Sequence, residues 1–101
     1  IAAACLSIAT RLRDAPDLGG TYHFTGAPDI SWKGFAEAIF ETAGRDVAVT
    51  GISTAEYPTP AARPLNSRLD CQGTKAAFGI TRPDWRAALP RILDELGVST
   101  T

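Results

Sequence analysis

The chain has 101 residues, of which 45% are hydrophobic and 21% are charged, and its formal net charge is −1. This composition is typical of one ordinary globular domain with a modest core, and the balanced charge excludes a general nucleic-acid binder. No apolar run approaches the ~20 residues that a membrane-spanning helix needs.

Residues 1–13 predict an amphipathic helix, which Pro16 and the pair Gly19-Gly20 end. Its apolar stripe comprises Ile1, Cys5, Ile8, Ala9 and Leu12. The stripe is already in progress at Ile1, and the chain contains no methionine. We therefore interpret the chain as part of a longer protein. A domain removed from its neighbour should expose an apolar face, so we expect self-association through this helix or the face beside it.

A strand–helix–strand unit is predicted next. Residues 21–25 are short, aromatic and alternating, which is typical of a strand. Ser31 is placed to cap a helix over residues 32–43, and Gly44 is placed to end it. Residues 47–52 are rich in β-branched side chains and indicate a second strand. This order predicts a parallel pair with a right-handed crossover, and hence an α+β fold with flanking helices.

Two further helices are predicted in the last third of the chain. Asp70 can cap a short helix over residues 71–78, which Gly79 ends. Pro83 suits the first turn of the final helix, and Pro90 should kink that helix or mark its effective start. The apolar stripe of this helix comprises Trp85, Ala88, Leu89, Ile92, Leu93 and Leu96.

Most motifs of catalytic and cofactor chemistry are absent from the sequence. It has no glycine-rich phosphate loop and no Tyr-x-x-x-Lys, so we expect no cofactor site and no catalytic residue in this chain. Cys5 and Cys71 match no metal-ligand spacing, and we predict two free thiols in a cytoplasmic protein. The single histidine, His23, is expected to be structural, and Glu37 and Glu41 should lie on a solvated helix face.

The loop over residues 56–70 is the main candidate for a binding site. Arg63 precedes Pro64, which biases the Arg63 backbone to an extended form, and its planar guanidinium suits phosphate oxygens. The donors that follow are Asn66, Ser67 and Arg68. Spacing alone favours an alternative, a proline-rich surface connection whose arginines pair with ordinary carboxylates.

Four stretches together change this balance: "GTYHFTG", "SWKGFAEAIFE", "TAEYPTPAARPLNSRLD" and "RPDWRAALPRIL". They resemble the carboxy-terminal part of dTDP-4-dehydrorhamnose reductases, which belong to the extended short-chain dehydrogenase/reductase superfamily. The resemblance covers nearly the whole chain. Its specific part is "YPTPAARPLNSRLD", because the helices alone would be weak evidence.

The resemblance implies an enzyme of two domains. An amino-terminal Rossmann domain would bind NADH or NADPH and carry the catalytic Tyr and Lys, and a smaller carboxy-terminal domain would bind the dTDP-sugar. Residues 1–101 would be that smaller domain, with residues 1–18 as the connecting helix. Arg63-Pro64 and Asn66-Ser67 match the family's "RP-x-N-S" stretch, which lies near the nucleotide-sugar. Trp32 matches a family aromatic, for which we expect a core role.

Two other functions remain open from the sequence. One is a non-catalytic interaction module that docks on a partner chain through its apolar helices. The other is the same domain of a related sugar-nucleotide epimerase or dehydratase. A glycine-rich fingerprint and a Tyr-x-x-x-Lys upstream of Ile1 would favour the reductase.

Overall fold

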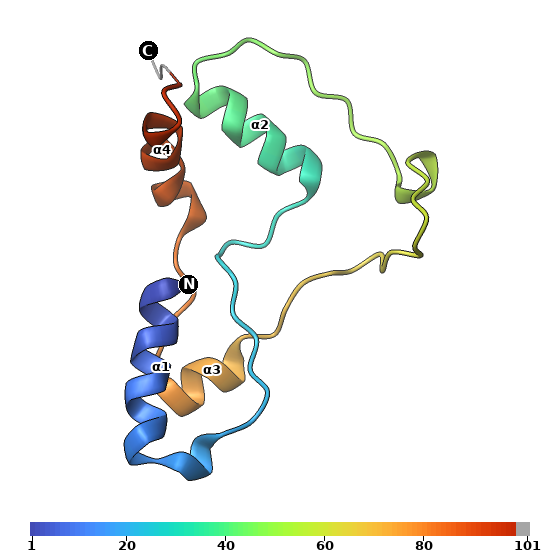
Figure 1. The fold of residues 1–101 in the computed structure, drawn as a ribbon. Coiled ribbons are helices and arrows are strands. Elements are labelled where there is room, and N and C mark those ends of the chain that lie inside the picture. The colour runs from blue at the N-terminus through green and yellow to red at the C-terminus, as the bar shows by residue number, and fades with distance from the viewer. Residues whose placement is uncertain (99–101) are drawn as a thin grey trace. The chain divides into compact units, whose positions relative to one another are not determined.

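The computed structural model describes residues 1–98 and shows four α-helices in that range, joined by loops (Figure 1). The helices are α1 (Ala2–Asp14), α2 (Trp32–Thr42), α3 (Gln72–Phe78) and α4 (Trp85–Glu95). Short 3-10 turns lie at Pro16–Leu18 and Thr54–Glu56. The chain divides into two compact units. The first comprises Ile1–Ala27 and Arg68–Pro83, and the second comprises Pro28–Ser67 and residues 84–98.

The first unit is built on α1 and α3, which contact each other. The predicted first helix is confirmed as α1, and Pro16 starts the 3-10 turn that follows it. The side chain of Asp70 accepts the N–H of Gln72 at 3.0 Å. The N-cap position is nevertheless Cys71, so α3 begins one residue later than predicted and Asp70 bonds to its first residue from one position before the cap. Gly79 ends α3 in the left-handed conformation, with φ 67°, which costs glycine no Cβ clash.

An aromatic contact and a buried hydroxyl hold residues 21–25 to α3. The rings of Tyr22 and Phe78 meet edge to face with centroids 4.9 Å apart. Thr74, which is 1% exposed, donates from Oγ1 to the carbonyl oxygen of His23 at 2.6 Å. The guanidinium of Arg82 donates to the carbonyl oxygens of Thr25 and Gly26. These side chains therefore bond to carbonyl groups that a strand would offer to a neighbouring strand.

The second unit is built on α2 and α4, which contact each other. Ser31 caps α2 as predicted, because its Oγ accepts the N–H of Gly34 at 3.1 Å. Gly44 follows α2 with φ 68°. The core comprises Ala43, Leu89 and Leu93, with Ala38, Ile39, Trp85 and Val98 packed against it.

Helix α4 differs in detail from the sequence-based expectation. It begins at Trp85 with Asp84 as its cap, because Asp84 Oδ1 accepts the N–H of Arg86 at 2.9 Å. Pro83 thus lies before the first turn, and the helix passes through Pro90. The expected stripe is only partly buried: Leu89 and Leu93 are buried, whereas Ile92 and Leu96 are exposed.

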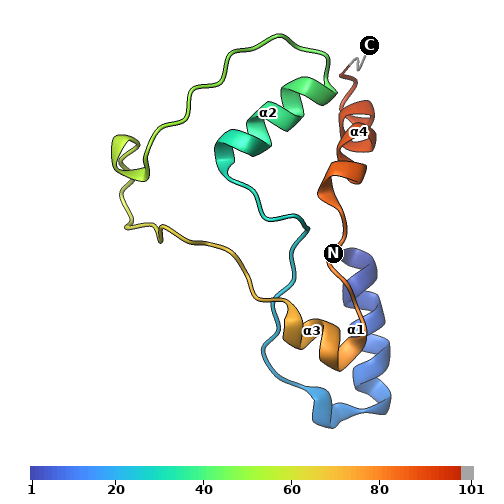
Figure 2. The same ribbon diagram turned by 180° about the vertical axis from the view of Figure 1, so that it is seen from behind.

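The predicted strand–helix–strand unit is not confirmed. No strand occurs in residues 1–98, and the confirmed part of the α+β expectation is its helices (Figure 2). The two segments, residues 21–25 and 47–52, fall in different units. β-branched and aromatic side chains favour a pleated surface only where a neighbouring strand completes the hydrogen-bond ladder. Composition identified the tendency, and the ladder partner that it needs is missing among the described residues.

The core role expected for Trp32 is also wrong. Its side chain is 87% exposed, although it touches Phe35 edge to face with centroids 6.4 Å apart. Phe35 and Trp85 supply the aromatic packing between α2 and α4, with centroids 5.3 Å apart. Trp85 is held in place because its Nε1 donates to the carbonyl oxygen of Pro28 at 2.7 Å. Trp32 stands at the first position of α2, one turn before the part of that helix that meets α4.

Candidate functional site

The candidate loop, residues 56–70, lies on the long connection between α2 and α3, drawn from green to yellow in Figure 1. It starts at the end of the 3-10 turn Thr54–Glu56 and ends at Asp70, whose side chain accepts the N–H of Gln72 at the start of α3. Within it, Thr59 Oγ1 donates to the carbonyl oxygen of Ala61 at 2.7 Å. A local side-chain bond of this kind fixes a turn where no ladder exists. The loop is therefore irregular but held at both ends and once inside.

All four predicted site residues are exposed. Arg63, Asn66 and Ser67 belong to the second unit, and Arg68 belongs to the first, because the division between the units falls after Ser67. Asn66 and Arg68 each make an interaction in the structure. The structure thus places three of the four residues in one unit and on one stretch of loop.

Arg63 has no hydrogen bond or ion pair in the described part of the chain. Its neighbours in the loop include Tyr57 and Leu65, which are 70% and 91% exposed. The alternative explanation of the loop requires its arginines to pair with carboxylates, and Arg63 does not. A planar cation that the fold leaves unpaired is available to bind two oxygens of an external anion.

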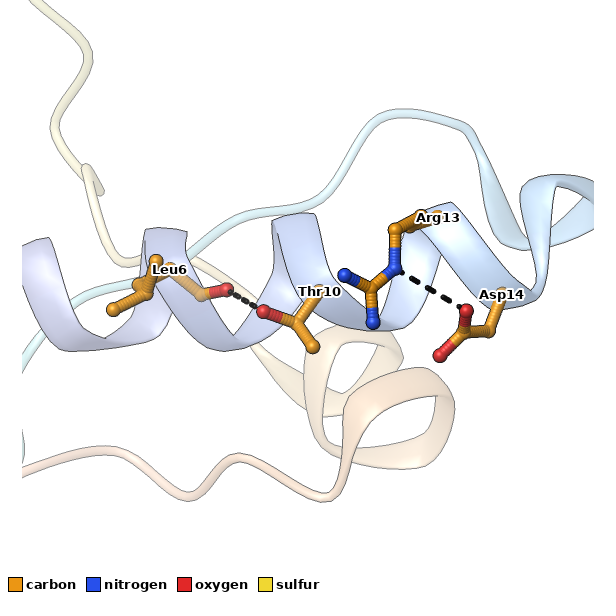
Figure 3. A network of polar contacts seen from close by, with 4 residues as sticks. All are labelled: Leu6, Thr10, Arg13 and Asp14. Atoms are coloured by element: carbon orange, nitrogen blue, oxygen red, sulfur yellow. Dashed lines mark hydrogen bonds and ion pairs between the residues drawn. The ribbon is translucent and has the colours of Figure 1, made fainter.

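A hollow of about 500 Å³ in the first unit was not predicted from the sequence. Its lining comprises Ala3, Leu6, Ser7, Thr10, Arg11, Asp14 and Phe78. Two of its polar groups are already engaged: Thr10 Oγ1 donates to the carbonyl oxygen of Leu6 at 2.9 Å, and Asp14 pairs with Arg13 at 3.3 Å (Figure 3). Helical spacing along α1 could have grouped most of this lining, but not Phe78, which comes from α3. The hollow offers no nucleophile with a base beside it.

The remaining charged candidates have structural or solvated roles. His23 is exposed, and its main-chain carbonyl makes the bond to Thr74. Glu37 pairs with Lys33 one helical turn away, at 3.7 Å, with both side chains about half exposed. Exposed ion pairs at this spacing add only about 0.3–0.5 kcal/mol to stability. The pair therefore agrees with a solvated helix face.

The described residues do not fit a dinucleotide. Such a cofactor needs glycine-rich backbone at a helix N-terminus that is open to the pyrophosphate. In α2 the N–H of Gly34 is bonded to the side chain of Ser31, and in α4 the N–H of Arg86 is bonded to the side chain of Asp84, whose carboxylate would also repel a pyrophosphate. Within residues 1–98 no three His, Cys, Asp or Glu side chains gather as a metal site would require. Both cysteines are free, with Cys5 exposed and Cys71 buried.

No helix in the described range is both long enough and apolar enough to cross a membrane.

Comparison with known proteins gives one consistent result. The family described as the RmlD substrate binding domain matches residues 1–98. A dTDP-4-dehydrorhamnose reductase from Sinorhizobium fredii is 41% identical over 99 residues, which are 92% of this chain and 33% of that protein. The enzyme of the same name from Aggregatibacter actinomycetemcomitans is 48% identical over 79 residues, 72% of this chain and 27% of the relative. That of Escherichia coli is 35% identical over 105 residues, 97% of this chain and 35% of the relative.

The chain spans about a third of the length of the curated relatives it matches. The family match, in contrast, covers the whole described range, including the loop that carries Arg63 and both helix pairs. The chain therefore belongs to the RmlD substrate binding domain family.

Proposed function

We propose that this chain is the substrate-binding portion of a cytoplasmic dTDP-4-dehydrorhamnose reductase. The parent enzyme reduces the 4-keto group of dTDP-4-dehydro-L-rhamnose to give dTDP-L-rhamnose. NADPH or NADH, bound by a separate amino-terminal Rossmann domain, supplies the hydride. Family membership, the names of the relatives and the two free cysteines, which suit a reducing compartment, support this proposal.

Within this assignment the loop over residues 56–70 holds the anionic part of the substrate. Arg63 binds the pyrophosphate, because its guanidinium is exposed and unpaired and because Pro64, which follows it, biases the Arg63 backbone to an extended form. Asn66 and Ser67 add neutral donors to phosphate or sugar, and Arg68 adds a second positive charge. The unpaired state of Arg63 is the observation that carries this site.

The amino-terminal part of the chain connects the two domains of the parent. Residues 1–18 include α1, none of whose 13 residues is buried. An isolated helix of this length is marginal in water, and most helical stability comes from packing an apolar face. The exposed face of α1 is therefore a surface for the parent's other domain, or for a second copy when that domain is absent.

A chimeric enzyme tests the function. In the Sinorhizobium chimera, residues 1–101 replace the matched stretch of the Sinorhizobium reductase. The chimera should oxidise NADPH or NADH when given the dTDP-4-keto sugar, whereas residues 1–101 alone should show no turnover. A folded chimera that binds a different nucleotide-sugar and not this one would contradict the assignment. Turnover by residues 1–101 alone would contradict the proposal that catalysis requires the separate amino-terminal domain.

A further inference from the structure

Residues 47–52, "VAVTGI", are left without backbone partners. The last backbone hydrogen bond before this segment joins the N–H of Arg45 to the carbonyl oxygen of Phe40. The first one after it joins the N–H of Glu56 to the carbonyl oxygen of Ser53. No residue from 47 to 52 makes a hydrogen bond within the described part of the chain. Figure 2 shows this segment as an open trace that leaves the end of α2.

Most residues of this segment are also exposed, and Val49 is partly buried. Val47 is 48% exposed and Ile52 is 56% exposed. The segment carries no charge and no proline, which are the residues that usually protect an unpaired strand edge. Residues 21–25, the other predicted strand, differ because Thr74 and Arg82 bond to their carbonyl groups. Residues 47–52 therefore combine strand composition with a full set of unused ladder groups.

A contact with α2 locates the segment within the second unit. A Cβ built on Gly51 would lie 2.8 Å from Cδ of Lys33, so the lysine stem lies directly against the Gly51 backbone. Any larger residue at this position would displace that stem. The segment thus has a position beside α2 that does not use its backbone hydrogen-bonding groups.

The unused backbone N–H and C=O groups of residues 47–52 are best satisfied by the backbone of another extended segment. A row of free N–H and C=O groups binds another strand, and β-branched side chains of alternating direction fix its register. A small ligand would satisfy only a few of these groups, and a helix would satisfy none of them because its own are used internally.

We propose that residues 47–52 pair as a β-strand with a strand from the rest of the parent polypeptide. The inference rests on the proposed function, because it takes the parent to be a reductase of the relatives' length. The chain covers 33–35% of two of those relatives, so most of the polypeptide able to supply a strand lies outside residues 1–98. A strand in the same polypeptide is present at an effective concentration of roughly millimolar, which a separate second copy does not reach at ordinary concentrations.

Pairing of this segment has a consequence for the binding loop. Ile52 is followed directly by Ser53 and the 3-10 turn Thr54–Glu56, where the loop begins. A strand fixed in a sheet would anchor the loop's first residues, as Asp70 and α3 anchor its last ones. The contact would then link the parent's other domain to the loop that presents Arg63.

Hydrogen exchange, read by mass spectrometry, tests the pairing. Exchange of residues 47–52 is compared between the Sinorhizobium chimera and residues 1–101 alone. We expect the amides to exchange about tenfold or more slowly in the chimera, because ladder bonds must open before exchange. Residues 34–42 of α2 should be protected in both proteins. Residues 61–63 of the loop should exchange fast in both without ligand.

Three outcomes would overturn the proposal. One is equal exchange of residues 47–52 in both proteins. Another is protection in residues 1–101 alone at every concentration, which would show pairing within this chain. The third is protection in residues 1–101 alone that rises with concentration, which would show pairing with a second copy. An unfolded chimera would show itself by loss of protection in α2. The same comparison is then made with the Escherichia coli enzyme as host.

A proline pair sharpens the test. Successive N–H groups of a strand point to opposite sides, so an edge strand uses only alternate ones in its ladder. In the chimera, Ala48→Pro and Val49→Pro should differ, and only one of them should abolish the protection of the segment. Loss or retention of protection in both variants would contradict an edge strand. Binding of the dTDP-sugar is measured on the same chimera. A protected segment without sugar binding would leave the strand proposal standing and refute the proposed function.

Discussion

Thr74 Oγ1 donates to the carbonyl oxygen of His23 at 2.6 Å across 51 residues of sequence, and Thr74 is the most completely buried side chain described. The bond joins α3 to the segment that follows the 3-10 turn Pro16–Leu18. It is a long-range tie within the first unit, and it gives a main-chain carbonyl of a strand-like segment a side-chain partner in place of another strand.

Thr74→Val should lower the free energy of unfolding by about 1–3 kcal/mol, because it leaves a carbonyl group unsatisfied near a buried site. Thr10→Val removes the same kind of bond, from Thr10 Oγ1 to the carbonyl oxygen of Leu6, but on an exposed helix face (Figure 3). That control should change stability by less than about 0.5 kcal/mol. Urea denaturation of both variants measures the difference, and equal effects would show that the Thr74 bond has no special role.

Leu89→Ala should destabilise the second unit by about 2–5 kcal/mol, since it opens a cavity in the small core of Ala43, Leu89 and Leu93. Leu96→Ala, at the C-cap of the same helix and 72% exposed, should stay within about 0.5 kcal/mol of the unmutated chain. Circular dichroism in urea measures both changes. If Leu89→Ala already loses helix in buffer without urea, the destabilisation exceeds the stability of the second unit. Matching losses in the two variants would contradict the described core.

The sequence predicted the helices better than the rest, for reasons that particular residues show. Ser31 and Gly44 act locally, and so the bounds of α2 follow from residues within one turn. Trp32 has the same apolar character as Phe35, and only the position of α4 decides that one is buried and the other is not. The predicted strands do not form among the described residues, because a ladder needs a partner, and no local pattern of residues 21–25 or 47–52 reports whether one is present.

The candidate site shows the same division. The loop could be located from its prolines and arginines, and the resemblance supplied its ligand. That Arg63 lacks a carboxylate partner could not be foreseen, because it depends on where every acidic side chain lies. The hollow beside α1 was missed for a related reason, since Phe78 is brought to it only by the packing of α3 on α1.

Residues 1–101 alone should self-associate through α1, because its N-cap residue Ile1 is 86% exposed and Leu6, within the helix, is 71% exposed. Leu6→Lys should shift the protein toward the monomer, because a charge replaces apolar surface in the contact. Ser7→Lys adds the same charge at the next position without removing an apolar side chain, and it should have the smaller effect. Sedimentation velocity over a range of concentrations measures this. A monomer at high concentration that binds no hydrophobic dye would contradict an exposed apolar face.

The central claim is that the loop over residues 56–70 binds the pyrophosphate of a dTDP-sugar through Arg63. The most direct test is the kinetics of Arg63→Ala in the Sinorhizobium chimera. A charge-assisted hydrogen bond contributes about 1.5–3 kcal/mol, so kcat/KM should fall about tenfold to a hundredfold, mainly through a higher KM for the dTDP-sugar. Arg63→Lys should recover only part of the loss, because an ammonium cannot bind two oxygens as a planar fork does.

The matched control is Arg91→Ala, which removes an exposed arginine whose pairing with Glu95, at 3.9 Å, lies on the outer face of α4. It should leave KM for the dTDP-sugar unchanged, and affinity for NADPH or NADH should barely move in any of the three variants. A higher KM for the dTDP-sugar in Arg63→Ala alone is the predicted result. Normal binding of the dTDP-sugar by Arg63→Ala, or a loss that falls on the cofactor, would show that Arg63 is an ordinary surface residue and would contradict the account.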